Sequence, residues 1–478
     1  MTSRRKTEAS LYDAVLYLAI LHRSGAAPFD AVQSLAEYAD YFGEAAKAFR
    51  QVVSDTRLGC TLHEGICRLA ETTPSEKFRQ FLFGYTAAVN TSGTAVPYLE
   101  DVLETLREEK RIRQEKYLSA LEVFAEIYLT LFVALPLFAV ITGMVLGMLN
   151  SAEPAFLGLG IPMFLIPGTA AYLLLLDSMD ESISLPHRDF AEKGAGLQSP
   201  ELRAYMKRRA RQECRFGTAA YFTRKPETVF QVSLPAGILV SLPFTDFPYL
   251  WTLLFLLTVF VPYAVFHFLH EREQAAKETS VPDFCRRLAG AVSQGECLSC
   301  AIERIAAEEK SPLENDIRRL SGEIRLGETV ASALYRFASR VKLLSVDRTV
   351  ILLTESAKYS ADISQTAAAA SCEIKEQLRH SLARKEGMSL YTAVIYLAYC
   401  VFVFVAVILL TVFLPAMSAA EFSGDLYETA LINAVLIQGI CSGLAAGKMG
   451  EGAVLAGVKH ACVLFASGML VFFATGIL

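Results

Sequence analysis

Residues 439–460 read GICSGLAAGKMGEGAVLAGVKH, and two explanations compete for the glycines and the first lysine of this stretch. A phosphate-binding loop needs Gly, four residues, Gly-Lys and then Ser or Thr, but here Ser replaces the first Gly and Met follows the Lys. Read as a helix, the stretch places Gly439, Gly443 and Gly447 on one small-residue ridge, which is typical of closely packed membrane helices. We therefore predict helix packing here and no nucleotide site.

The composition of the whole chain also indicates a membrane protein. Of its 478 residues, 53% are hydrophobic and only 20% are charged, and the mean hydropathy is +0.36. Soluble globular proteins are rarely this apolar. The net charge of −5 is mild and gives no reason to expect a nucleic-acid partner. The N-terminal stretch MTSRRKTEAS lacks an apolar region behind its basic start, so no cleavable signal peptide is expected.

Seven apolar runs predict an all-α, polytopic membrane fold with about seven transmembrane helices, because most runs reach the ~20 residues that cross a bilayer. The runs are Ile127–Leu149, Phe156–Leu176, Val229–Phe244, Tyr249–Leu269, Leu390–Leu414, Leu426–Ala446 and Ala453–Leu478. The third run is short and contains two prolines, so its ends stay open. Four domains follow: a cytoplasmic bundle at 1–116, four spans at 117–269 with a basic loop at 177–228, a second bundle at 270–388, and three spans at 389–478.

The basic residues lie in alternate connections between these runs. They precede the first run, fill the loop after the second, precede the fifth and occur again at Lys448, whereas the other connections carry none. The positive-inside rule therefore predicts a cytoplasmic N-terminus and an external C-terminus. The densest basic patch either anchors the chain to anionic lipid or docks an acidic cytoplasmic partner, and both alternatives stay open. The docking candidates in it are Lys207, Arg208, Arg209 and Arg211.

The two polar blocks resemble each other. The first contains RLGCTLHEGICRLAE, starting at Arg57, and the second contains RLGETVASALYRFAS, starting at Arg325. Each turn glycine has a counterpart at a nearly equal spacing, and a helix-ending turn with positive φ explains such glycines. The matched turn glycines are Gly25 and Gly295, and Gly59 and Gly327. Two copies of one bundle give two related faces for binding.

Two further features concern polar or reactive side chains. Lys459 and His460 lie inside the last apolar run, where charge is costly. Lys459 either snorkels or pairs with a neighbouring helix, with Glu126 and Glu428 as candidates, or it has a direct mechanical or binding role. Cys297 and Cys300 form a CxxC without the second ligand pair that zinc requires, so we expect small core residues.

The repeated bundles, their links to membrane spans, and the stretch GLAAGKMGEGAVLAGVKH together resemble the type II secretion system F-domain family. The resemblance is to its archaeal members, which are membrane platform proteins of type IV pilus and archaellum-like machines. The residues of the C-terminal motif that carry it are Gly447, Lys448, Gly452, Gly457, Lys459 and His460. The small number of spans favours a pilus-type system over the archaellum.

The resemblance implies a protein of the cytoplasmic membrane that is not an enzyme and has no cofactor, metal or catalytic residues. A hexameric cytoplasmic secretion ATPase would bind the two blocks, and pilin-like subunits would pass from the lipid bilayer into a filament. A homodimer of chains would also present several related faces to such a ring. A secondary transporter, or a membrane scaffold or sensor, is the alternative function.

Overall fold

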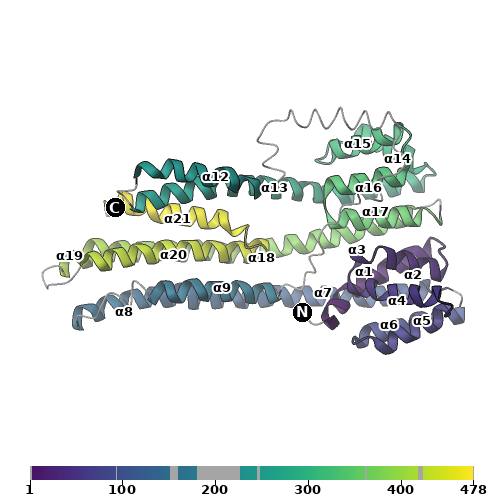
Figure 1. The fold of residues 1–478 in the computed structure, drawn as a ribbon, viewed down its shortest axis with the longest axis horizontal. Helices are drawn as coiled ribbons and strands as arrows, with labels where there is room; N and C mark the ends of the chain where they lie inside the picture. The colour runs from purple at the N-terminus through teal and green to yellow at the C-terminus, as the bar shows by residue number, and fades with distance from the viewer. Residues whose placement is uncertain are drawn as a thin grey trace. The chain divides into compact units, whose positions relative to one another are not determined.

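The computed structural model describes residues 3–92, 94–150, 160–179, 227–244, 248–360, 363–417 and 424–476. Every regular element in these ranges is helical, and the helices form two compact units (Figure 1). Unit 1 contains the described residues within 1–113 and 273–379. Unit 2 contains those within 114–180, 216–272 and 380–478. The all-α fold predicted from the sequence is confirmed.

Unit 1 contains both polar blocks. The helices of the first block are α1 (Ser3–Arg23), α2 (Pro28–Glu37), α3 (Ala39–Phe42), α4 (Glu44–Arg57), α5 (Leu62–Thr72), α6 (Glu76–Ser92) and the start of α7 (Val96–Tyr128). Those of the second are the end of α13 (Pro248–Ser293), α14 (Leu298–Glu308), α15 (Glu314–Arg325), α16 (Val330–Val341), α17 (Leu344–Ser356) and the start of α18 (Ser364–Ile408). The order is the same in both, apart from the one-turn helix α3.

Two turns between helices occur in both blocks with the same backbone conformation. φ is 90° and 87° at the first pair of turn glycines, Gly25 and Gly295, and 103° and 86° at the second pair, Gly59 and Gly327. Such φ values are cheap only for glycine. Two residues after the second turn, Thr61 and Thr329 each cap the following helix, because the side chain accepts a hydrogen bond from the third helical N–H. The matching glycine turns and threonine caps favour the same helical hairpin in both blocks.

The two blocks of unit 1 share one hydrophobic core. A single cluster of buried side chains draws residues from both blocks, and α1 and α3 pack against α17. Its largest fully buried members include Tyr17, Phe42, Phe49, Phe78 and Phe337. The repeats are therefore two halves of one folded body.

Unit 2 contains the most apolar helices. Besides parts of α7, α13 and α18, it consists of η1 (Leu129–Ala134), α8 (Leu135–Asn150), α9 (Ile161–Met179), α12 (Glu227–Ser241), η3 (Leu242–Phe244), η4 (Leu409–Phe413), α19 (Leu414–Met417), α20 (Gly424–Glu451) and α21 (Gly457–Ala474). Among the described residues, six helices are long and apolar enough to cross a membrane. The third predicted run forms a shorter apolar helix, Thr228–Ser241. The chain is a multi-pass membrane protein.

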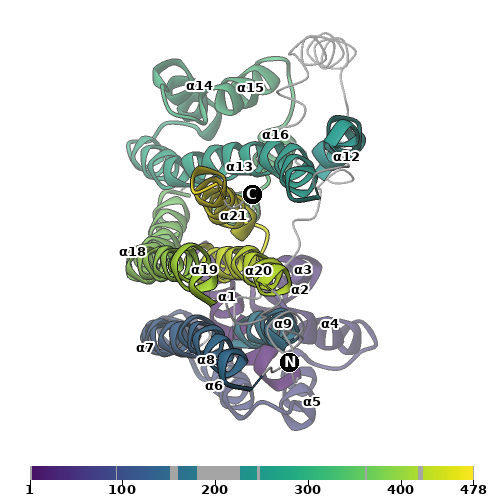
Figure 2. The same cartoon turned by 90° about the vertical axis from the view of Figure 1, so that its left-hand side faces the viewer.

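The helices of unit 2 have a packed interior and an apolar exterior. α20 lies between α21 and α9, as the two views of Figures 1 and 2 show. Large apolar side chains on the outer faces of the unit 2 helices are 65–79% exposed, which suits contact with lipid. They include Met163, Leu174, Leu239, Phe404 and Leu470.

Two π-helical segments occur at matching places in the repeat. η1 follows α7 and η4 follows α18, and each precedes a Leu-Pro pair, Leu135-Pro136 or Leu414-Pro415. The N–H of Leu135 donates to the carbonyl of Thr130, and that of Leu414 donates to the carbonyl of Leu409, so each bond spans five residues. Proline lacks an N–H and its ring clashes with the carbonyl four residues earlier, which explains the wider turn. The repeat thus extends from the bundles into the membrane helices.

Candidate functional site

Helices α20 and α21 pack with their backbones in direct contact. A Cβ added to Gly443 would overlap the backbone nitrogen and Cα of Ala461. One added to Gly447 would overlap the backbone of a facing glycine in α21, and one added to Gly439 would lie 2.9 Å from the hydroxyl of Tyr399 in α18. Only glycine allows the backbone approach at Gly443 and Gly447, so this part of the ridge is a contact between α20 and α21.

Polar and charged side chains surround the point where α20 turns into α21. We call this group the hairpin collar; it consists of Asp177, Arg384, Lys448, Glu451, Lys459 and His460. The side chain of Lys448 is 6% exposed, and its Nζ lies 2.7 Å from Asp177 Oδ1 in α9. Arg384 of α18 donates through Nη2 to the carbonyl of Lys448 at 3.2 Å. The N–H of Gly452 donates to the same carbonyl, at 3.1 Å, and its φ of 81° turns the chain.

The second half of the collar lies on α21. Lys459 forms an ion pair with Glu451, the last residue of α20. The partners expected from the sequence, Glu126 and Glu428, do not form this pair. Its Nζ also lies 5.2 Å from the ring centre of Phe268 in α13. His460 Nδ1 lies 2.8 Å from the hydroxyl of Tyr396 in α18. The collar therefore ties the last two helices to α9 through an ion pair, to α18 through hydrogen bonds, and to α13 through a cation–aromatic contact.

A buried carboxylate joins the two blocks of unit 1. Glu355, whose side chain is 4% exposed, accepts hydrogen bonds from Ser34 at 3.0 Å and from Tyr38 at 2.9 Å, both in the first block. Lys358 of its own block donates to both carboxylate oxygens, at 2.7 and 2.8 Å. Burial alone would lower the pKa of Lys358, but the bonds to Glu355 outweigh it and the pKa is raised. Burial, reinforced by Tyr335 and Glu355, raises the pKa of Tyr38 well above its ordinary value.

A second carboxylate repeats this arrangement at another point of contact between the blocks. Glu373 of α18 accepts from the hydroxyl of Tyr12 at 2.6 Å and from Lys110 Nζ at 2.9 Å. Burial raises the pKa of Glu373, but Lys110 and these hydrogen bonds outweigh it and the pKa is lowered. Nearby, Arg348 of the second block forms an ion pair with Asp13 of the first at 2.9 Å. Charged contacts thus fix the register of the two repeats.

An ion pair across the repeated hairpin appears in both blocks. In the first block Arg68 lies 3.3 Å from Asp55, and at the matching positions of the second block Arg336 lies 4.0 Å from Glu323. The second block adds an ion pair between Arg336 and Glu328, at 3.0 Å. The shared pair belongs to the repeat, because both partners recur at the same offsets from the turn glycine.

One protein family matches the chain in two separate segments, one for each repeat. The family described as type II secretion system (T2SS), protein F, matches the chain at residues 14–143 and 284–411, which together make up more than half of it. The chain belongs to the type II secretion system protein F family. Each match covers most of one block, with its turn glycines, and most of the apolar run that follows. The α20–α21 hairpin and most of its collar lie beyond the matched residues.

This F-family chain is also similar to an uncharacterized protein of Methanocaldococcus jannaschii. The two are 21% identical over 450 residues, which cover 91% of this chain and 74% of that protein. No solved structure matches the chain.

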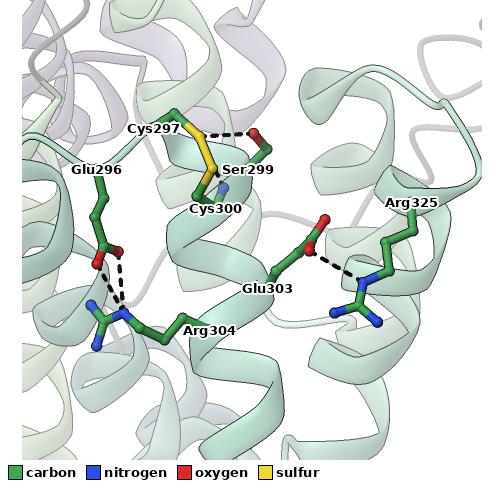
Figure 3. The surroundings of a disulfide bond; sticks show 7 residues. All are labelled: Glu296, Cys297, Ser299, Cys300, Glu303, Arg304 and Arg325. Carbon is green, nitrogen blue, oxygen red and sulfur yellow. Dashed lines mark hydrogen bonds and ion pairs between the residues drawn. A yellow bond between two sulfur atoms is a disulfide. The ribbon is translucent and has the colours of Figure 1, made fainter.

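The CxxC of the F-family chain does not lie in the core. Cys297 is the residue before α14, Cys300 is in its first turn, both are exposed, and a disulfide joins them (Figure 3). The prediction of small core residues was therefore wrong, because the turn at Gly295 brings the N-terminus of α14 to the surface. The predicted docking residues Lys207, Arg208, Arg209 and Arg211 lie outside the described residues.

Sequence reasoning did not identify three residues whose contacts tie distant helices together in the structure. Asp177 lies in the last turn of the apolar helix α9, and Glu355 and Glu373 lie on helices that carry other charged residues. Their partners are 263 to 361 residues away for Glu373, and 271 residues away for Asp177. The one available signal was that Glu355 follows the apolar stretch Val350–Leu353, which indicates a buried helix face.

Proposed function

We propose that this chain is the integral-membrane platform of a type IV filament assembly or secretion machine, of pilus type. It would couple a hexameric cytoplasmic ATPase to the extraction of pilin-like subunits from the membrane. The observation that carries the proposal is that the secretion-system F family matches both repeats, each together with the apolar run behind it. The chain itself carries no phosphate-binding loop, so the energy would come from a separate protein.

The connectivity of the units supports a mechanical role. α7, α13 and α18 each contribute residues to both units without a break in the helix. Force applied to the bundle would therefore reach the membrane helices through continuous hydrogen-bonded backbone. The shared core and the carboxylates Glu355 and Glu373 would keep the two blocks moving as one body. The π-helical segments are the natural places for α7 and α18 to bend, because π turns interrupt the regular helical ladder.

The proposed orientation places unit 1 and the basic loop in the cytoplasm and the C-terminus outside, in the cytoplasmic membrane. Its support is the alternation of basic and non-basic connections along the sequence. This side of the membrane is where an ATPase and ATP are available. An Arg209→Cys variant in sealed, right-side-out vesicles should react with an impermeant maleimide only after lysis. Labelling before lysis would contradict the orientation.

The test of the function is binding to the cognate secretion ATPase. We expect the purified chain to hydrolyse no ATP, to co-purify with the ATPase, and to stimulate its turnover. Binding should weaken as salt rises to physiological levels, because the Debye length falls to about 8 Å. Reversing the charges of Lys207, Arg208, Arg209 and Arg211 should weaken it further. The matched control reverses Arg224 and Lys225, at the other end of the same loop.

The outcomes separate the alternatives. If the variant reversed at Lys207, Arg208, Arg209 and Arg211 binds the ATPase as strongly as the wild type does, the basic loop returns to a role as lipid anchor. Absence of binding by the wild-type protein at any salt concentration would refute the platform function and leave a transporter or a scaffold.

A further inference from the structure

The turn before α14 does not need cysteines at positions 297 and 300 in order to form. The first block makes the same turn with Ala27 at the position of Cys297 and Asp30 at the position of Cys300. The backbone angles agree: φ and ψ are −64° and 151° at Ala27, and −66° and 149° at Cys297. Because alanine supports the same geometry without a side-chain cap, packing and turn formation do not explain two cysteines in the second block.

Other bonds hold α14 in place around the cysteines (Figure 3). Arg304 pairs with Glu296 across the turn at 3.1 Å, and Arg325 of α15 pairs with Glu303 at 3.2 Å. The N–H of Glu296 donates to the carbonyl of Ala291 at 3.2 Å. Breaking the disulfide therefore leaves the helix docked, so that the pair can change its oxidation state without unfolding its surroundings.

The location of the pair favours thiol chemistry. Both cysteines are exposed, and Cys297 Sγ accepts a hydrogen bond from the N–H of Cys300 at 3.2 Å. This sulfur is at the N-cap of an 11-residue helix, where the helix dipole stabilises negative charge. The disulfide closes only one helical turn, and it joins no second element of the fold.

We propose that Cys297 and Cys300 form a reversible thiol–disulfide exchange site, whose reactants are soluble thiols and disulfides. In oxidation, the Cys297 thiolate attacks one sulfur of a small disulfide, and a mixed disulfide forms as one thiolate leaves. The Cys300 thiolate then attacks Cys297 Sγ, closing the internal disulfide and releasing the second thiolate. Both leaving groups take up the two protons that the cysteines have lost, so two thiols of the chain are oxidised as one disulfide is reduced.

The proposed cytoplasmic location would make this site a sensor. In a reducing compartment an exposed disulfide of this kind is transient, and it forms when the ratio of disulfide to thiol rises. The proposal itself depends only on the pair and its surroundings, so it stands or fails separately from the ATPase experiment.

The test uses the full-length protein in detergent, equilibrated in buffers of reduced and oxidised glutathione. Free thiols are trapped by acid, alkylated with a maleimide and counted by mass spectrometry. We expect the wild type to lose two labels in one step as the oxidised fraction rises, and to regain them on return to reduced glutathione. The Cys297→Ser, Cys300→Ser double variant should lose neither; serine is a good N-cap, so its fold should persist. Cys60→Ser should behave as the wild type does.

A single variant tests the order of attack. In Cys300→Ser the second step is blocked, so a glutathione adduct should accumulate on Cys297. The proposal is overturned if no two-label step occurs in fully oxidising buffer, if the loss is irreversible, if the double variant shows the same step, or if the single variant gains no adduct.

Discussion

The contact between α20 and α21 gives the sharpest stability test of the membrane unit. A methyl group added at Gly443 would overlap the backbone nitrogen and Cα of Ala461, which cannot rotate away as a side chain can. Overpacking of this kind costs about 1–3 kcal/mol, and a rigid backbone favours the upper end of that range. Alanine gains about 0.5–1 kcal/mol over glycine inside a helix. Gly443→Ala should therefore lower the free energy of unfolding by about 2 kcal/mol.

A matched control lies in the same unit. Gly387 is exposed in α18, and a Cβ there would meet nothing within 4 Å. Gly387→Ala should gain the helix-propensity term without the overlap, so that the two substitutions should change stability in opposite directions. Gly443→Leu should go further than Gly443→Ala and lower the yield of folded protein.

The assay is equilibrium unfolding in detergent, followed by the fluorescence of Trp251, which is the single tryptophan of the chain and lies in α13 of unit 2. The midpoints of wild type, Gly443→Ala and Gly387→Ala would be compared under one set of conditions. A Gly443→Ala protein as stable as the wild type, beside a Gly387→Ala protein that behaves as expected, would refute the close-contact argument.

Two further predictions concern unit 1. Glu355→Gln should lower the free energy of unfolding by about 2–3 kcal/mol, because the hydrogen bonds of a buried carboxylate are charge-assisted. Glu314→Gln, in a surface pair, should cost under about 1 kcal/mol. Unfolding followed by far-UV circular dichroism, which reports the helices of unit 1, measures both, and equal effects would refute the role of the buried carboxylate. Burial lowers the pKa of His22, which lies 2.8 Å from the hydroxyl of Tyr85, from 6.5 to about 4. The unfolded chain therefore binds the proton first, and stability should fall by up to about 3 kcal/mol as the pH drops from 6.5 to 4. In His22→Gln this part of the pH dependence should be absent from pH-dependent unfolding curves, and an unchanged slope would contradict the assignment.

Features that depend on local physics could be predicted from the amino-acid sequence. Hydropathy identified the membrane class, since a run of about 20 apolar residues has few other uses. The spacing of Gly59 and Gly327 after matching helices revealed the repeat, because a helix-ending turn with positive φ admits little besides glycine. The four-residue step from Gly439 to Gly447 indicated a packed helix face, because residues at that step lie on one side of a helix.

Contacts between groups far apart in the chain became visible only in the folded protein. Lys448 pairs with Asp177, and Glu355 with Ser34 and Tyr38, because folding brings together helices that are far apart in the chain. No local pattern encodes such pairs, since a glutamate in a helix that will be buried looks like one on a solvated face. The exposure of Cys297 is likewise not encoded by a local pattern. Two cysteines three residues apart share one face of any helix. Whether that face meets the core or the solvent depends on how α14 packs.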